Sequence, residues 1–235
     1  MITIQNLSKT FSQREPLFSG ASLTIAPHTV TVITGPSGSG KTTLLRMIRG
    51  EEPYDSGRIL LDRKEVSRLN SRSLMMLRRD MGMVCQENNL LAERSVLENI
   101  ALPLRIKGIH GALLRTRVEK MIELFKLEKV AFTACGVISG GEKRKVSMAR
   151  AMSVAPGILL ADEPSAGLDP LQTLELITIL FALPLEEGTT LIVATHNPTL
   201  LEGLGVHGTY RIRDGQLQGD DCHVELPSEM ERFTL

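Results

Sequence analysis

The segment from Gly35 to Thr42 reads GPSGSGKT, which is the spacing of a loop that binds phosphate groups. Its glycines allow backbone amides to point at an anion, and Lys41 adds a positive charge. A strand-like run over 30–34 precedes it and a helical pattern over 42–49 follows, which is the context that such a loop requires. The complete match argues against the alternative, a glycine-rich turn in front of a helix.

This loop defines the first group of candidate residues. The backbone amides and the start of the helix are expected to hold the β- and γ-phosphates of a nucleotide, and Thr42 is expected to offer its hydroxyl to Mg²⁺. The predicted nucleotide-binding residues of the loop are Gly35, Ser37, Gly38, Ser39, Gly40, Lys41, Thr42 and Thr43.

Two carboxylates end the apolar run ILLADE over 158–163. A buried strand would deliver Asp162 to its end, where the carboxylate can hold Mg²⁺. Because adjacent side chains on a strand diverge, Glu163 would do a different job, and it is the candidate to orient and deprotonate an attacking water. An isolated Asp-Glu pair is usually a solvated turn, so the prediction depends on the phosphate loop.

Two further polar residues follow apolar runs. His196 comes directly after the strand predicted to end at Thr195 and could contact the γ-phosphate and position the water. Gln86 follows MGMVC and could reach the metal and the water from the other side. Taken alone, either residue would more often be ordinary polar surface.

The stretch ISGGEKRKVSMARA over 138–151 has two interpretations. Ser139 and Glu142 have the spacing of a capping box, so a capped surface helix that ends at Pro156-Gly157 is the local interpretation. Gly140 and Gly141 also suit the close approach of another group to the backbone.

Composition and patterning limit the class of protein. The 235 residues carry 27 basic and 27 acidic side chains and only 3% aromatics, so nucleic acid is not an expected partner. The three cysteines form no metal or disulfide pattern, the N-terminus has no signal peptide, and the apolar run over 177–185 is too short to span a bilayer. These features predict a soluble, cytoplasmic protein.

Strands alternating with helices predict an α/β fold with a mostly parallel sheet. Buried strands are expected over 158–161 and 191–194, and an alternating strand over 2–7 opens an N-terminal antiparallel β subdomain. The segment 87–156 has helical periodicity, so we expect a helical lobe inserted in a core formed by 1–86 and 157–220, with 221–235 as a loose tail.

The order of these motifs resembles that of the ABC-type ATPases over essentially the whole chain. ISGGE resembles the family signature LSGGQ, and SAGLD resembles the loop that supplies Asp169, although Lys143-Arg144-Lys145 stands where the family usually continues with glutamines. The resemblance implies a head-to-tail homodimer that sandwiches ATP. In it, Ser139, Gly140 and Gly141 would grip the γ-phosphate bound by the other subunit, and Phe11 would stack on adenine unless it is a core aromatic.

LLADEP, ENIALPL and the paired Arg78-Arg79 resemble the branch that includes the cell-division ATPase FtsE and the lipoprotein-releasing ATPase LolD, with FtsE the nearer. This branch implies a peripheral protein at the inner face of the cell membrane, with a membrane partner docked near 86–104. The alternatives are a soluble ABC ATPase acting on DNA or ribosomes, and a nucleotide switch that barely hydrolyses.

Overall fold

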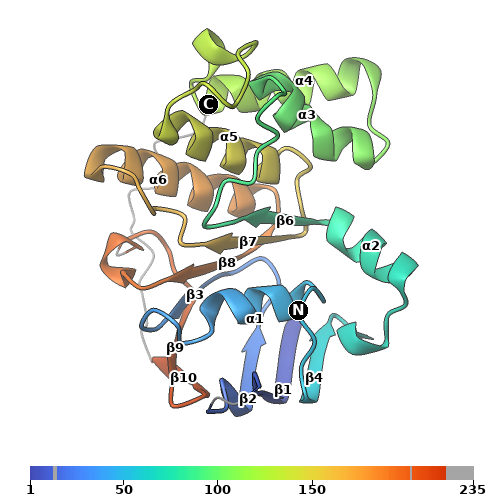
Figure 1. Ribbon diagram of the computed structural model, residues 1–235, viewed down its shortest axis with the longest axis vertical. Helices are drawn as coiled ribbons and strands as arrows, with labels where there is room; N and C mark the ends of the chain where they lie inside the picture. Colours follow the sequence, from blue (N-terminus) through green and yellow to red (C-terminus); the bar gives the residue numbers. More distant parts are fainter. Residues whose placement is uncertain (13–14, 202, 221–235) are drawn as a thin grey trace.

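The computed structural model describes residues 1–12, 15–201 and 203–220 (Figure 1). A four-stranded antiparallel sheet, in the order β2-β1-β4-β5, lies at one end of the molecule. Its strands are β1 (Ile2–Lys9), β2 (Phe18–Ile25), β4 (Ser56–Leu61) and β5 (Lys64–Glu65). The alternation of buried and exposed residues in β2 is the pattern of a sheet with one solvated face. The N-terminal antiparallel β subdomain of the expected fold is confirmed.

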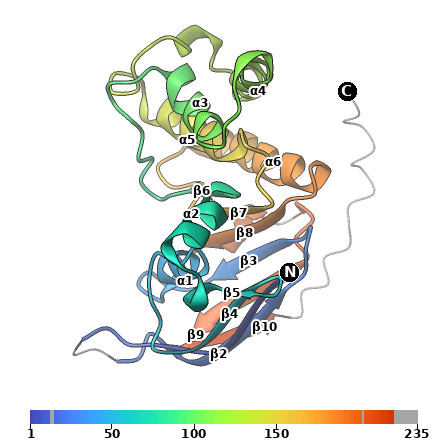
Figure 2. The ribbon, with the colours of Figure 1, turned by 90° about the vertical axis from the view of Figure 1, so that its right-hand side faces the viewer.

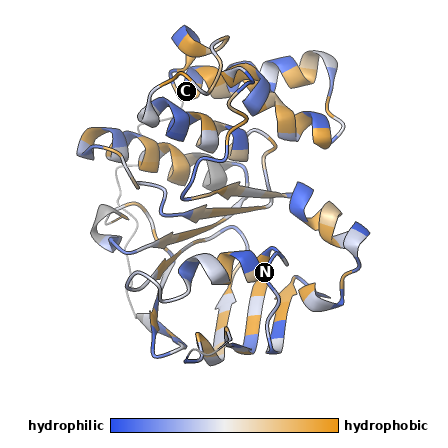
Figure 3. Cartoon of the chain, in the orientation of Figure 1, coloured by the Kyte–Doolittle hydropathy of each residue, from blue (hydrophilic) through white to orange (hydrophobic). Residues whose placement is uncertain are grey.

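The second sheet has six strands in the order β10-β9-β3-β8-β7-β6. Its strands are β3 (Val30–Thr34), β6 (Met81–Val84), β7 (Ile158–Asp162), β8 (Thr190–Thr195), β9 (Gly208–Arg213) and β10 (Gln216–Asp220). All neighbouring strands are parallel except β9 and β10. Every residue of β3 and β8 is buried, which explains the continuous apolar run over 191–194 in β8 (Figure 3). The mostly parallel sheet predicted from the sequence is confirmed.

Six α-helices complete the described fold. They are α1 (Lys41–Ile48), α2 (Ser71–Arg79), α3 (Val96–Ile106), α4 (Gly111–Leu124), α5 (Gly140–Met152) and α6 (Pro170–Glu186). Short 3₁₀ turns are η1 (Val66–Arg68), η2 (Glu128–Val130) and η3 (Pro198–Leu201). Helices α3, α4 and α5 gather at the end of the molecule opposite the antiparallel sheet (Figures 1 and 2).

The two faces of the six-stranded sheet belong to two separate hydrophobic clusters. Val32 and Val193 face a cluster formed with helices α3 to α6. Ile33 and Ile192, their neighbours along the same strands, face a cluster formed with α1 and the antiparallel sheet. Because side chains alternate along a strand, α1 and α5 lie on opposite faces of the sheet.

Helix α5 ends earlier than the sequence predicted. The expected end was Pro156-Gly157, whereas the helix stops at Met152. Ala155 has a left-handed backbone with a φ of 46°, which turns the chain before the proline is reached. The segment 87–156 contains α3, α4 and α5, but the boundaries proposed for an inserted lobe stay a prediction, and the predicted tail over 221–235 lies outside the described residues.

Within the described ranges, every helix is too short or too polar to cross a bilayer. Cys85 and Cys135 are free thiols, and Cys222 lies outside the described residues.

Candidate active site

The phosphate loop connects β3 to α1 and leaves the start of this helix open. Gly40 is the N-cap residue, with a left-handed φ of 105°, and no side chain caps the helix. The left-handed backbone favours glycine, and a Cβ at this position would also lie only 3.0 Å from side-chain atoms of Leu17 and Phe18. The first amides of α1 therefore remain available to an anion, as predicted for a phosphate site.

Lys41 is held inside the loop. Its side chain is 7% exposed, and Nζ donates hydrogen bonds to the carbonyl oxygens of Gly35 (2.8 Å) and Pro36 (3.2 Å). The same Nζ lies 3.5 Å from Oε1 of Glu163. The phosphate loop and the second predicted carboxylate are thus brought into contact.

Glu163 lies between a cation and an imidazole. Its Oε2 is 2.9 Å from Nδ1 of His196 and accepts a hydrogen bond from the hydroxyl of Thr195 at 3.2 Å. This meeting follows from the sheet, because β7 and β8 are parallel neighbours in which Asp162 lies opposite Ala194. Glu163 itself has a left-handed φ of 45°, which turns the chain as it leaves β7.

Asp162 lies on the other side of the phosphate loop, with Thr42 and Gln86. The three residues line one cavity of about 620 Å³. Asp162 is 2% exposed, and its Oδ1 has no hydrogen-bond partner in the protein. Burial raises the pKa of this carboxyl, against the opposing effect of a hydrogen bond with Thr42.

These oxygen donors fit Mg²⁺. A carboxylate oxygen without a partner, a hydroxyl and an amide oxygen are hard ligands of the kind that this ion prefers. Among the described residues, no group of three or more His, Cys, Asp or Glu side chains could hold a metal by itself. A magnesium ion here would therefore keep waters or bind together with phosphates, which is its usual behaviour.

A cavity of about 410 Å³ adjoins this cluster on the nucleotide side. Phe11, the phosphate loop, Gln86, Glu163 and His196 are among the residues that line it. Phe11 is 39% exposed, and Nζ of Lys9 lies 4.6 Å from its ring centroid. The interpretation of Phe11 as a core aromatic is therefore wrong, whereas its stacking on adenine stays a prediction.

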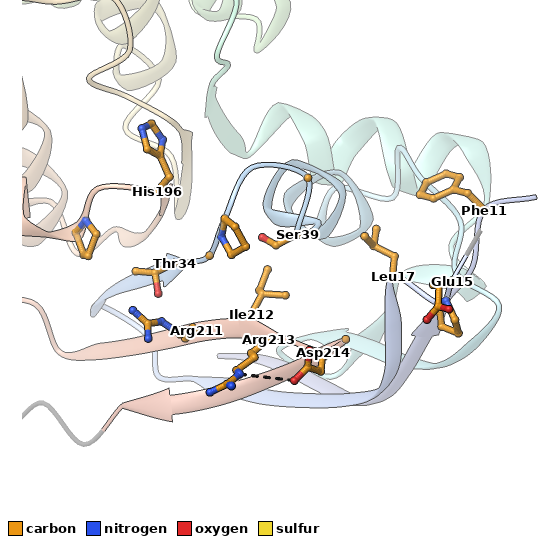
Figure 4. A pocket seen from close by; sticks show the side chains of 16 residues that line it. Phe11, Glu15, Leu17, Thr34, Ser39, His196, Arg211, Ile212, Arg213 and Asp214 are labelled. Atoms are coloured by element: carbon orange, nitrogen blue, oxygen red, sulfur yellow. Dashed lines mark ion pairs between the residues drawn. The ribbon is translucent and has the colours of Figure 1, made fainter. Parts of the chain in front are cut away.

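A third cavity, of about 760 Å³, continues from Phe11 along the outer side of the loop (Figure 4). Ser39 and Leu17 lie on its loop side, and Arg211 and Arg213 of β9 form its floor (Figure 4). Ser39 Oγ is buried and has no partner in the protein. The space around the phosphate loop is thus large enough, and polar enough, for a nucleotide.

Ser139, Gly140 and Gly141 lie apart from this cluster, at the start of α5 on the opposite face of the sheet. Both halves of the predicted capping box are present: Glu142 N donates to Ser139 Oγ at 3.3 Å, and Ser139 N donates to Glu142 Oε2 at 2.9 Å. A Cβ added to Gly140 would meet no atom within 4 Å. The predicted capping box is confirmed, and Gly140 faces open space.

Asp169, another predicted nucleotide-binding residue, has a local role at the start of α6. Its Oδ1 accepts a hydrogen bond from the amide of Gln172 at 2.9 Å, directly before Pro170 in the first turn. An Asp cap followed by proline is a common way to begin a helix.

Sequence reasoning missed Arg144, which the basic run Lys143-Arg144-Lys145 presents as surface. The guanidinium is 2% exposed and reaches the backbone beside both Gln86 and Glu163. A signal existed in the sequence, because Arg144 shares a helix face with Met148 and Ala151, both of which are buried.

The phosphate loop after β3, the carboxylates at the end of β7 and the histidine beyond β8 define a P-loop ATPase. A family profile described as "ABC transporter" matches residues 18–166, and the chain belongs to this family. It therefore contains an ABC ATPase domain.

Several relatives by sequence are named as methionine import ATP-binding proteins. MetN of Cereibacter sphaeroides is 37% identical over 88% of this chain and 60% of its own. MetN 3 of Pseudomonas fluorescens is 35% identical over 96% of this chain and 70% of its own. The chain spans about 60% of the length of the first of these curated relatives.

Solved structures agree with the fold. The ATP-binding cassette MJ0796, a dimer in a post-hydrolysis state with ADP and Pi, has a TM-score of 0.85 and 30% identity over 94% of this chain and 98% of its own. The cbiO1 component of the cbiONQ transporter from Clostridium perfringens has a TM-score of 0.78 and 26% identity over 92% of this chain and 86% of its own. The cell-division branch that the sequence suggested receives no support from these relatives.

Proposed function

We propose that this ATPase binds ATP between the phosphate loop and Phe11, and hydrolyses it with Glu163 as the general base. The observation that carries this proposal is the position of Glu163, whose carboxylate contacts Lys41 on one side and His196 on the other. A water held beside Glu163 would lie next to any phosphate bound by the loop.

Each residue of the proposed active site has a distinct role. The open amides of α1 and Nζ of Lys41 bind the phosphates, since both present positive charge to an anion. Glu163 accepts the proton of the attacking water. His196 holds the carboxylate of Glu163 in place through Nδ1. Asp162, Thr42 and Gln86 would hold Mg²⁺, which neutralises charge on the phosphates when it is bound.

We further propose that two copies act together, each contributing Ser139, Gly140 and Gly141 to the nucleotide held by the other. Gly140 and Gly141 have no left-handed backbone that would require glycine. For Gly140 there is also no neighbouring atom that a Cβ would meet. A glycine that its own chain does not need suits an approach from outside, and the cassette MJ0796 is dimeric with ADP and Pi bound.

The membrane partner belongs to the proposal as well. The named relatives serve methionine import, so we propose an importer of methionine or a similar amino acid as the complex that this ATPase drives. An FtsE-like role rested partly on Arg78-Arg79. Arg78 has a local task, since it donates hydrogen bonds to the carbonyl oxygens of Arg49 (3.1 Å) and Gly50 at the end of α1. That pair therefore gives no reason to prefer cell division.

The membrane partner would dock near 86–104. Burial and local pairing leave only some residues of this segment for contact with it. Val96 is fully buried, and Glu98 caps α3 while pairing with Arg94 at 3.1 Å. Leu91, 47% exposed, and the exposed Glu93 remain as candidates for contact. A switch that binds ATP without hydrolysis is the less favoured function, because it would not need Glu163.

The test is Glu163→Gln in the full chain. Glutamine keeps the shape but cannot accept the proton, so we expect ATP hydrolysis to fall at least 100-fold while ATP binding stays within about twofold. With ATP, this variant should accumulate as a dimer, measured by light scattering after size exclusion. Parental turnover in the variant would refute the role of Glu163.

The cargo needs a separate experiment. The ATPase should be co-purified with its membrane subunits in detergent, and hydrolysis should be measured with methionine and with a dissimilar amino acid such as aspartate. ATP hydrolysis that is faster with methionine but not with aspartate supports methionine import. Equal hydrolysis with and without either amino acid contradicts it.

A further inference from the structure

Arg144 is buried beneath the active site without a carboxylate that pairs with it at hydrogen-bond distance in the described residues. It projects from α5, three residues beyond Gly141, and its guanidinium is directed at backbone oxygens. Nε donates to the carbonyl of Pro164 at 2.8 Å, and one terminal nitrogen donates to the carbonyls of Glu163 and, at 3.3 Å, Asp162. One edge of the guanidinium therefore holds the turn that presents both carboxylates.

The other terminal nitrogen holds a second segment. It donates to the carbonyl oxygens of Cys85 and of Gln86, the latter at 3.2 Å, and reaches Oδ1 of Asn88 at 3.4 Å. Arg150, two turns further along α5, continues this grip on the carbonyls of Asn88 (2.9 Å) and Asn89 (2.8 Å). Of these two arginines, Arg144 binds both the segment around Gln86 and the segment around Glu163. The hydrogen bonds of Arg150 reach only the segment that follows Gln86.

Stability alone is a poor reason for such a residue. Taking a guanidinium out of water is costly, and burial lowers the pKa of Arg144 accordingly. An apolar side chain of similar volume would fill the same space at less cost. What an apolar side chain could not supply is the fixed fork of donors that joins two backbone segments at set positions.

We propose that Arg144 is a positioning residue: it fixes the backbone of Glu163 and Gln86 to α5, the helix that Ser139 caps. The contacts are to backbone oxygens, so they set where the side chains of Glu163 and Gln86 start rather than touching substrate. A displacement of about 1 Å in a catalytic group can cost about 100-fold in rate, which makes such positioning significant.

The arrangement also connects two surfaces of one chain. The start of α5 would hold the nucleotide of the partner copy, while Arg144 on the same helix positions Glu163, the base that takes the proton of the water attacking the chain's own nucleotide. Engagement of Ser139–Gly141 would then be transmitted to Glu163 through a rigid helix and one side chain. This inference rests on the proposed function, in which the two copies share their sites.

The experiment compares Arg144→Met with the matched control Lys145→Met in the full chain. Lys145 is the next residue of the same helix, but it pairs with Glu175 at 3.5 Å, away from the cavity. We expect Arg144→Met to lower kcat at least tenfold with the Kd for ATP within about twofold, and Lys145→Met to keep both. Arg144→Lys should recover part of the kcat, since an ammonium keeps the charge but not the fork.

A double variant separates positioning from a general loss of structure. If Arg144 acts largely through Glu163, then Arg144→Met should lower the residual turnover of Glu163→Gln by a much smaller factor than it lowers parental turnover, because coupled residues are not additive. Equal fold losses in both backgrounds would overturn the proposal, as would a parental kcat in Arg144→Met. Should that variant not fold, a parental kcat in Arg144→Lys overturns it instead.

The same series distinguishes the two proposals. If Glu163→Gln keeps parental turnover, the role of Glu163 is wrong and this inference falls with it. If Glu163→Gln is inactive and only the Arg144 variants retain parental kcat, the proposed function stands and this inference alone is overturned.

Discussion

The N-termini of α1 and α5 are both rich in glycine, but only one of them is capped by a side chain. Helix α1 begins at Gly40 with no side-chain cap, and Lys41 lies in its first turn. Helix α5 begins at Ser139 with a complete capping box and an acidic residue, Glu142, in its first turn. The first amides of α1 lack a side-chain acceptor and lie beside a cation, whereas the N-terminus of α5 is capped by side chains of the same chain.

The difference shows which of the two can bind an anion by itself. The open amides of α1 and the buried ammonium of Lys41 form a phosphate site within one chain. At α5 the carboxylate of Glu142 already accepts a hydrogen bond from the Ser139 amide and places a negative charge there. A phosphate at this position therefore needs positive charge from another loop. The comparison predicts that the first site works alone and the second only in a dimer.

The largest expected effect comes from Lys41→Ala, which removes the cation of the α1 site. We expect the Kd for ATP to rise roughly 1,000-fold, or about 4 kcal/mol at 1.4 kcal/mol for each tenfold change. Equilibrium binding of a fluorescent ATP analogue measures it. The matched control is Lys143→Ala at the start of α5, which should leave binding unchanged. ATP binding that survives Lys41→Ala would contradict the assignment of α1 as the primary site.

Ser139→Arg should break the second site and spare the first. ATP binding to the single chain should stay within about twofold, while hydrolysis should fall roughly 100-fold because the bulky cation blocks closure of the dimer. Mixing this variant with Lys41→Ala offers a sharper measurement, since one of the two shared sites in the mixed dimer is then intact. Partial return of hydrolysis supports sharing between copies. Loss of ATP binding by Ser139→Arg alone would mean that the segment acts within its own chain.

Asp162→Asn, beside α1, should lower ATP hydrolysis but raise the thermal stability of the fold. Hydrolysis with Mg²⁺ should fall tenfold or more, whereas the Tm should rise at pH 8. Because burial raises the pKa of Asp162, the folded chain holds the proton more readily than the unfolded chain, so the charged carboxylate destabilises the fold as pH rises through that pKa. The gain in Tm should therefore shrink at lower pH. A variant less stable than the parent at pH 8 would show that the charge is already compensated.

Glu142→Ala has the smallest expected effect. Losing half of the capping box should cost about 0.5–1 kcal/mol in the free energy of unfolding at pH 7, measured with urea. Hydrogen bonds from Ser139 lower the pKa of Glu142, so its contribution is present above the ordinary pKa and is lost as pH falls through the lowered value. Glu98→Ala removes the equivalent half of the capping box that Ser95 forms in α3 and should also lower the urea midpoint. A loss above about 3 kcal/mol in Glu142→Ala alone would contradict a purely local cap.

The sequence by itself determined the parts of the site that are local. The spacing of Gly35, Gly40 and Lys41 specifies a loop and helix start whose geometry is set within eight residues. The capping box of Ser139 and Glu142 is local for the same reason, and the apolar runs before Asp162 and Thr195 identified strands buried on both faces.

Only the tertiary structure decided how distant segments meet. Glu163 contacts His196 because β7 and β8 happen to be neighbours in register, which no spacing along the chain encodes. Phe11 could be taken as a core residue until its exposure beside the phosphate loop was seen. Arg144 reads as a surface cation because charge usually lies in water, and only the packing of α5 against the sheet surrounds it with backbone carbonyls that replace the lost solvent.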